Sequence, residues 1–208
     1  MKRYTVDEIL KLNPCSPYTR RKIQKLWGER KSLSLVSIME LAIPVEDKLW
    51  VACRLLGRRT LVAWACDCAE RVLLIYEKEY PKDKRPRKAI KITRAWLAGK
   101  ATLEDVKAAV YAANAARAAA DAAADAAADT SDTAYAADAA DAAAYAAHTA
   151  DAADATSVAI AAAHAAIAAA HAVYVTTNAI AERTWQSKRM LEYIRGEAKP
   201  AVKKGRKH

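Results

Sequence analysis

The aspartates of the alanine-rich part of the chain are the residues whose spacing most clearly suggests a binding chemistry. Four of them follow one another at intervals of 4, 4 and 3 residues, and two more follow out of phase. Intervals of three and four place carboxylates on one face of a helix. Such a face attracts a basic surface on a partner. The predicted partner-binding residues are Asp121, Asp125, Asp129, Asp132, Asp138 and Asp141.

The densest cluster of basic residues lies between positions 82 and 94. Lysine and arginine bind phosphate groups, so this cluster could hold an anionic nucleotide or nucleic acid. The alternative interpretation is that these cations pair with the acidic alanine-rich helices of the same molecule. Both interpretations stay open at this point. The candidate anion-binding residues are Arg85, Arg87, Lys88, Lys91 and Arg94.

Cysteine and histidine spacing argues against a metal site. Cys66 and Cys68 are closer in sequence than paired zinc ligands usually are, and residues two apart in a helix point about 200° away from each other. One of these thiols should therefore be buried and the other should face outward. His164 and His171 share a helix face but lie about 10.5 Å apart along its axis. We therefore expect no metal and no cofactor.

Enzymatic chemistry is not indicated by any motif. The chain has five glycines, and all of them occupy helix-stop or tail positions. It therefore lacks the glycine-rich phosphate loops, and most of the flexible loops, on which active sites are usually built. No Ser/His/Asp constellation is visible either. The sequence favours a non-enzymatic binding protein.

Charge is distributed unevenly along the 208 residues. Residues 1–100 carry 23 Lys and Arg against 11 Asp and Glu, a net +12, whereas residues 101–181 carry 2 against 10, a net −8. Residues 182–208 carry 9 against 3, a net +6. The charged start of the chain has no signal-peptide pattern, and aspartates interrupt the alanine stretch too often for a membrane span. We expect a cytoplasmic protein with free thiols and no membrane partner.

Start and stop signals divide the first hundred residues into short helices. Thr5 with Glu8, and Thr102 with Asp105, have the spacing of a capping box. Ser16 is predicted to cap the second helix, which ends near Gly28. The remaining helices are expected at about 6–12, 35–42, 45–56, 59–79 and 84–98.

The alanine-rich region should be helical throughout, because alanine has the highest helix propensity. A single helix from 103 to 195 would be about 140 Å long, so we expect it to fold back. The turn is predicted at 129–133, with a second weak point at 154–157 and a last helix at about 157–195. The predicted fold is all-α, a compact bundle of short helices packed with long alanine-rich antiparallel helices. Its expected regions are 1–100, 101–195 and a disordered basic tail at 196–208, with Trp50, Trp64, Trp96 and Trp185 in or at the edge of the core.

Several separate blocks agree in order with a known family. They are NPCSPYT at 13–19, IPVEDKLW at 43–50, CDCAERVLLIYEKEYPKDKRPRKAI at 66–90, RAWLAGKAT at 94–102, the alanine-rich run, and ERTWQSKRMLEYIRGE at 182–197. This order resembles the alanine-rich immunity proteins of bacterial polymorphic toxin systems, which also occur in phages and mobile elements. Relatives often carry Trp and Arg in the alanine run, where this chain has Asp, Tyr and His.

The resemblance implies a protein that neutralises a cognate toxin by stoichiometric binding. Toxins that act on nucleic acid have basic clefts, which an acidic face would complement. The alternative hypothesis is a phage or mobile-element protein that sequesters an anionic nucleotide or binds nucleic acid through its basic N-terminal region. A third interpretation is a scaffold in which the alanine helices form a homo-oligomer.

Overall fold

The computed structural model describes residues 2–126, 131–152, 155–172 and 179–200. Over these residues it contains ten helices and one two-stranded sheet, so the all-α prediction is confirmed. The elements are β1 (Arg3–Tyr4), α1 (Val6–Leu10), α2 (Arg20–Trp27), β2 (Leu33–Ser34), α3 (Leu35–Met39), α4 (Val45–Leu55), α5 (Arg58–Glu79), α6 (Arg85–Leu97), α7 (Leu103–Ala126), α8 (Ser131–Asp151), α9 (Ala155–Ala172) and α10 (Ala179–Arg195).

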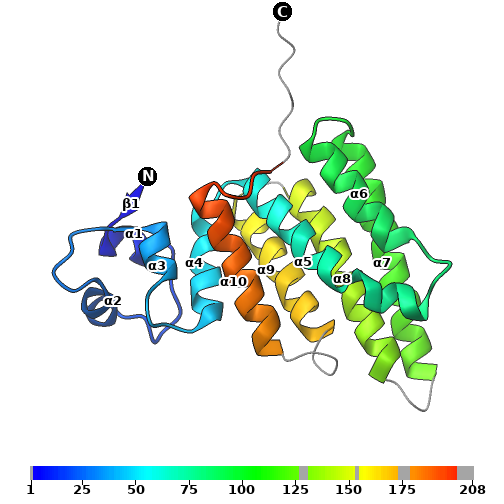
Figure 1. Cartoon of the computed structure of the whole chain (residues 1–208), viewed down its shortest axis with the longest axis horizontal. Helices are drawn as coiled ribbons and strands as arrows, with labels where there is room; N and C mark the ends of the chain where they lie inside the picture. Colours follow the sequence, from blue (N-terminus) through cyan, green and yellow to red (C-terminus); the bar gives the residue numbers. More distant parts are fainter. Residues whose placement is uncertain (1, 127–130, 153–154, 173–178, 201–208) are drawn as a thin grey trace, which may run out of the picture.

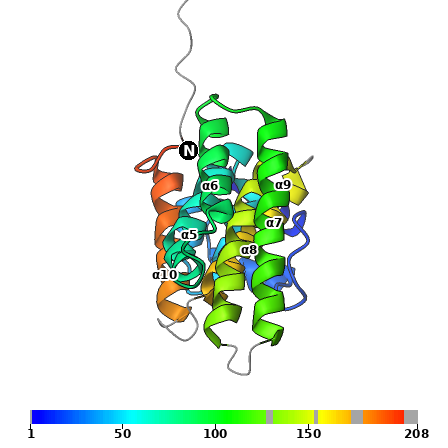
Figure 2. The ribbon, with the colours of Figure 1, turned by 90° about the vertical axis from the view of Figure 1, so that its right-hand side faces the viewer.

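The long helices form two packed layers (Figures 1 and 2). One layer runs α7, α8, α9 and α4, and the other runs α6, α5 and α10. Helices α5 and α8 pack against each other across the boundary between the two layers, and each also contacts helices of both layers. Two layers suffice to bury one apolar stripe of each helix. Buried residues from Tyr4 to Tyr193 belong to a single hydrophobic core.

Helix α5 is the most enclosed element of the core. Trp64, Cys66 and Cys68 are all fully buried in it, so the prediction that one of the two thiols faces outward is wrong. The physical reason is that α6, α8, α9 and α10 surround α5 on more than one side. Burial raises the pKa of Cys66 to about 12, which leaves the thiol protonated and unreactive at neutral pH. The indole N–H of Trp64 donates to the Gln186 carbonyl at 3.1 Å.

The alanine helices fold back on one another, as the sequence predicted. Helix α7 ends at Ala126 and α8 begins at Ser131, so the second half of the turn predicted at 129–133 is already helical. Residues 127–130 lie outside the described part of the chain. Helix α8 ends at Asp151 and α9 begins at Ala155, close to the second weak point. Most alanines of α8 are fully buried, because a single methyl side chain lets neighbouring backbones approach closely.

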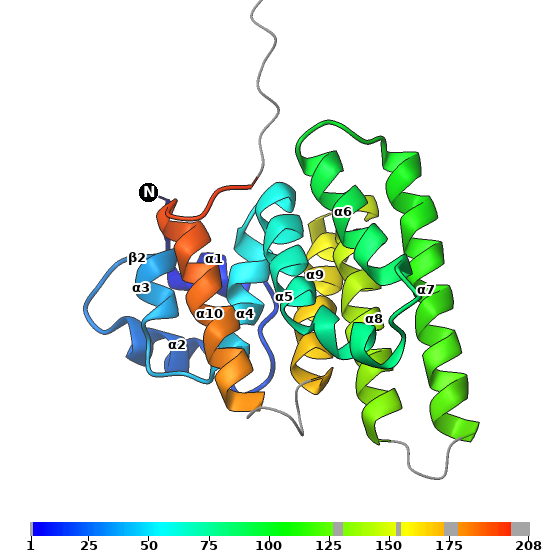
Figure 3. The same cartoon turned by 45° about the vertical axis from the view of Figure 1, so that its right-hand side comes forward.

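The prediction of one last helix at about 157–195 is wrong, because α9 and α10 are separate helices in different layers (Figure 3). The sequence between them is VYVTTN. Its β-branched residues and asparagine have lower helix propensity than the surrounding alanines. Helix α10 packs against α3, α4, α5 and α9 and thereby joins the N-terminal elements to the alanine layer.

The N-terminal lobe comprises β1, α1, α2, β2 and α3, at one end of the two layers (Figure 1). The Thr5–Glu8 capping box is present, as is that of Thr102 and Asp105. The prediction that Ser16 caps the second helix is wrong: α2 begins at Arg20, and the Thr19 hydroxyl accepts from the Lys22 N–H. The residues after Ser16 instead form a turn in which the Tyr18 N–H donates to the Cys15 carbonyl.

The four tryptophans expected in or beside the core lie there: Trp64 is fully buried, and Trp50, Trp96 and Trp185 are half-buried against it. The predicted basic tail falls largely on residues 201–208, outside the described part of the chain. Among the described helices, none combines the length and apolar character needed to cross a membrane.

Candidate partner-binding face

Three stripes of larger side chains stand on the outer surface of the alanine layer. Within each helix these side chains recur at intervals of three or four residues, which defines one face. We call the three stripes together the outer face. Its members are Lys107, Tyr111, Asn114, Arg117 and Asp121 on α7, Asp138, Asp141, Tyr145 and His148 on α8, and His164, Ile167 and His171 on α9.

Side-chain contacts place the stripes of α8 and α9 next to each other. The rings of Tyr145 and His164 meet edge to face with centroids 4.9 Å apart. His171 lies near enough to Asp138 to act on its pKa. Tyr111, His148 and His171 are exposed and accessible to a partner, whereas Asp141 and Tyr145 are half-buried.

A groove of about 600 Å³ separates the stripes of α7 and α8. Its lining is mainly polar, in contrast to the alanine surface on either side. Two tyrosines, Tyr111 and Tyr145, border it, and Tyr111 is 76% exposed. Its charged and hydrogen-bonding lining comprises Lys107, Asn114, Arg117, Asp141, His148 and Asp151.

An arginine bridges the two walls of this groove. The Arg117 guanidinium contacts the Asp121 carboxylate at 2.7 Å on its own helix and the Asp141 carboxylate at 3.5 Å on α8. Arg117 and Asp121 remain substantially exposed, whereas the Asp141 side chain is only 26% exposed. The outer face therefore has its own ion-pair network.

Burial dominates the electrostatics of the two aspartates of α8. Desolvation raises the pKa of Asp141 to about 6, although the nearby Arg117 guanidinium opposes the shift. Desolvation also raises the pKa of Asp138, which His171 opposes and Asp121 reinforces. A carboxylate with a raised pKa is insufficiently stabilised in its charged form. Both groups would gain from an additional cation.

Asp151 closes one end of the groove and has an unsatisfied acceptor. Its Oδ1 atom is buried and has no hydrogen-bond partner among the described residues. Buried polar atoms are normally hydrogen-bonded, because an unmade bond costs the full desolvation of the group. A donor supplied by a partner would satisfy it.

The structure brings together only part of the predicted acidic set. Asp121, Asp138 and Asp141 meet on the outer face. The expectation of a single helix face for the first four aspartates is wrong, because α7 ends at Ala126 and Asp132 belongs to α8. Asp129 lies outside the described residues, and the side chains of Asp125 and Asp132 are likewise not described.

The predicted anion-binding residues lie on α6, and three of them are engaged with acids. Arg85 pairs with Asp83 at 2.6 Å, Arg87 pairs with Glu77, and Arg94 contacts both Asp67 and Glu70. The pairing hypothesis assumed that these cations pair with acids of the alanine helices. The acids that they contact belong instead to α5 and to the loop after it. Lys88 and Lys91 are exposed. Anion binding by this cluster stays a prediction.

Sequence reasoning missed Tyr111, Tyr145, His148 and Asp151 as members of the site. A usable signal was present: in an alanine helix, every large side chain at three- or four-residue spacing marks the same face. For metals, no three His, Cys, Asp or Glu side chains within the described ranges are grouped so that they could share an ion.

Comparison with known proteins gives one result. A family model described as "Imm-5 like putative immunity protein" matches residues 52–193. The matched segment runs from α4 to α10 and includes all of the outer face. No curated protein and no solved structure matches the chain.

Proposed function

The chain belongs to the Imm-5 like family of immunity proteins, and from this we propose that it neutralises a cognate toxin by binding it stoichiometrically through the outer face. The observation that carries the proposal is the polar groove between α7 and α8, which lies within the segment that defines the family.

The charge of the alanine layer determines the kind of toxin surface that fits. Residues 101–181 carry a net −8 in a chain whose total is +10. Complementary charge speeds association and selects the partner. A toxin with a basic cleft, such as one that acts on nucleic acid, would meet this layer favourably.

The side chains of the groove also favour a basic partner. Within the groove, Asp141 is desolvated and Asp151 has an unsatisfied oxygen. A lysine or arginine of the toxin that enters the groove would bring the missing positive charge and the missing donor. The exposed Tyr111 ring offers such a cation a face on which to rest.

The test begins with identification of the toxin by affinity capture with the tagged chain, followed by reconstitution of the purified pair. We expect a one-to-one complex that suppresses the activity of the toxin. The triple variant Asp121→Asn, Asp138→Asn and Asp141→Asn should bind more weakly by at least about tenfold, because each lost charged contact is worth about 1 kcal/mol or more.

A matched control neutralises three exposed glutamates away from the outer face, Glu29→Gln, Glu46→Gln and Glu197→Gln. The two triple variants have the same net charge, so a general electrostatic effect would weaken both equally. Equal affinity of the two variants, or inhibition by the outer-face variant as strong as that by the wild type, would exclude the outer face as the contact.

A further inference from the structure

A basic surface lies on the N-terminal lobe, along α2 and the loop that follows it. Residues 20–31 contain six Lys and Arg against one Glu, and all six cations are exposed. We call them the α2 basic surface: Arg20, Arg21, Lys22, Lys25, Arg30 and Lys31. The whole lobe precedes residue 52, where the family match begins. The surface is therefore separate from the outer face that is proposed to bind a toxin.

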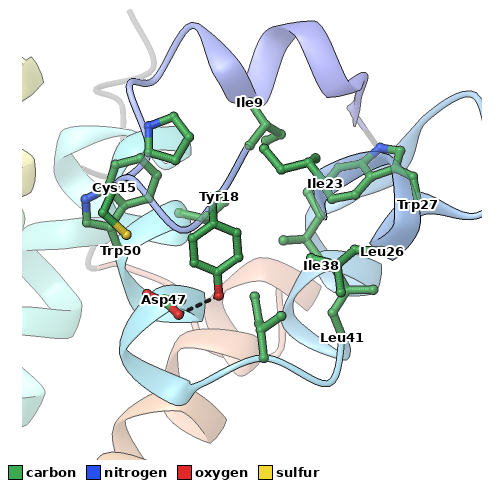
Figure 4. A pocket seen from close by; sticks show the side chains of 13 residues that line it. Ile9, Cys15, Tyr18, Ile23, Leu26, Trp27, Ile38, Leu41, Asp47 and Trp50 are labelled. Carbon is green, nitrogen blue, oxygen red and sulfur yellow. Dashed lines mark hydrogen bonds between the residues drawn. The ribbon is translucent and has the colours of Figure 1, made fainter. Parts of the chain in front are cut away.

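The local sequence of α2 turns these cations toward solvent. Ile23 and Trp27 are buried, and Figure 4 shows both side chains turned toward Ile38 in the interior of the lobe. Arg21 and Lys25 each lie two positions from Ile23, which is about 200° around the helix. They therefore project from the opposite side of α2, about 6 Å apart along its axis.

Most cations of the α2 basic surface are not neutralised by acids of the protein. Arg20 contacts Asp7 at 2.5 Å, whereas the other five make no ion pair with any described residue. All three arginines of α6, in contrast, pair with acids. An external anion can bind an unpaired cation without first displacing an internal carboxylate. The structure therefore favours α2 over α6 as a place for an anionic partner.

Two of these cations are already held in position. The Arg30 guanidinium donates from Nε to the Trp27 carbonyl at 2.8 Å and from Nη2 to the Leu26 carbonyl at 3.1 Å. The Lys22 ammonium lies over the Tyr18 ring, 4.1 Å from its centroid. A side chain that is held before binding loses less conformational entropy on binding. Each of the two cations keeps N–H donors for a ligand.

The surroundings of the α2 basic surface favour one class of polyanion. A helix that enters a membrane surface needs an exposed apolar face, but none of the exposed large hydrophobic side chains of the described chain belongs to the lobe. Binding of single-stranded nucleic acid relies on stacking against accessible aromatic rings. Tyr4 and Trp27 are buried, and Tyr18 is half-buried. A duplex needs neither feature, because its phosphates line its outside.

We propose that the α2 basic surface binds the phosphate backbone of a duplex nucleic acid without reading its sequence. Duplex DNA carries one negative charge per about 1.7 Å of its axis, so several phosphates lie within reach of the six cations. Contacts to phosphate carry no direct sequence information. Figure 1 places α2 and the α7–α8 pair at opposite ends of the molecule, so the acids of the groove lie far from this surface.

Fluorescence anisotropy of the full chain tests the proposal with a labelled DNA duplex, the RNA duplex of the same sequence, and one DNA strand alone. We expect the duplexes to bind with a Kd of about 1–100 μM at physiological salt and the single strand to bind more weakly. For the DNA duplex, the logarithm of the affinity should fall with the logarithm of the salt concentration with a slope of about −3 to −5. The tighter-binding duplex identifies the preferred source of the backbone.

No binding of either duplex at about 50 mM salt, where phosphate contacts are strong, would overturn the proposal. Tighter binding of the single strand would also overturn it. Vesicles of phosphatidylserine provide the membrane probe. Binding of these vesicles by a chain that binds neither duplex would assign the surface to lipid instead.

A triple variant locates the contact on α2: Arg21→Gln, Lys25→Gln and Lys31→Gln. Each removed cation should reduce the magnitude of the salt slope by about 1, and the three together should weaken duplex binding at least about tenfold at low salt. Glutamine has a helix propensity close to those of lysine and arginine, so α2 should remain helical, which circular dichroism verifies.

The matched control removes three exposed lysines on and just before α6: Lys82→Gln, Lys88→Gln and Lys91→Gln. Its net charge equals that of the α2 variant, and we expect it to keep most of the affinity and the salt slope of the wild type. Equal losses in the two variants would show that total charge, and not the α2 basic surface, determines binding. A larger loss in the control would place the contact on α6. Either result would overturn the proposal.

Discussion

Arg117 and Asp141 face each other across the groove between α7 and α8, with 3.5 Å between the guanidinium Nε and the carboxylate Oδ1, and yet the pKa of Asp141 is raised to about 6. The cation is shared, because another nitrogen of Arg117 contacts Asp121 at 2.7 Å. Burial of Asp141 in the alanine layer outweighs what remains of the attraction. In the isolated chain, the carboxylate of Asp141 on the outer face therefore lacks a sufficient counter-charge.

Stability should depend on pH through Asp141. Its pKa is higher in the folded chain than in the unfolded chain, so the folded state binds more protons between about pH 4 and pH 6. The contribution of Asp141 is fully present below the unfolded pKa and is lost as the pH rises through about 6. Asp141→Asn should therefore raise the free energy of unfolding more at pH 7.5 than at pH 4.5, by about 1–2 kcal/mol. Urea unfolding at both pH values measures this, and parallel profiles for the two proteins would disprove it.

Asp151→Ala should weaken binding of the toxin without lowering the stability of the fold. The buried Oδ1 atom makes no hydrogen bond in the described structure, and a carboxylate in the last turn of α8 opposes the helix dipole. Its removal should leave the free energy of unfolding unchanged or raise it by up to about 1 kcal/mol. Affinity for the toxin should fall at the same time. Loss of stability with unchanged affinity would assign Asp151 a structural role.

Asp67 should be a structural residue, because it holds three donors from two helices. Its carboxylate accepts from Arg94 at 2.7 Å, Arg189 at 2.6 Å and the Tyr193 hydroxyl at 2.9 Å. It is 10% exposed. Asp67→Ala would leave two partly buried arginines less well paired and should cost about 3–5 kcal/mol of unfolding free energy. Thermal and chemical denaturation measure it.

The exposed Lys91 of α6 provides the control for Asp67. Lys91→Ala should change the unfolding free energy by no more than about 0.5 kcal/mol. A similar cost for both variants would contradict the assignment of Asp67 as the organising residue.

Buried alanines of α8 should tolerate no enlargement. Ala146 is fully buried, so Ala146→Leu must displace neighbouring helices and should cost about 1–3 kcal/mol or more. Ala119 of α7 is exposed, and Ala119→Leu should be nearly neutral. Urea denaturation of both variants measures the two changes in unfolding free energy. If helix propensity alone mattered, Ala146→Leu and Ala119→Leu would have equally small effects, whereas close packing makes only Ala146→Leu costly.

Much of the secondary structure could be predicted from local sequence. The Thr5–Glu8 and Thr102–Asp105 capping boxes, the glycine after α4 and the alanine runs each act within a few residues. Local rules failed at Ser16, where the turn before Thr19 competes with an earlier helix start. They also failed for the helix predicted at about 157–195, because α9 and α10 are separate helices that belong to different layers.

The candidate site could be predicted only in part. Aspartate spacing pointed to the outer face, but spacing along one helix cannot say which residues of another helix lie opposite. Arg117 and Asp141 are 24 positions apart in the sequence, and their contact exists only because α7 and α8 pack side by side.

The sequence by itself determined that the chain is helical, because alanine propensity, capping residues and helix stops are properties of a residue and its near neighbours. The tertiary structure alone decided which stripes meet, that Cys66 and Cys68 are both buried, and that Asp141 is desolvated enough to have a pKa of about 6. The physical reason is that burial and electrostatic energies depend on the distances to every surrounding group, and those distances are established only when the two layers pack.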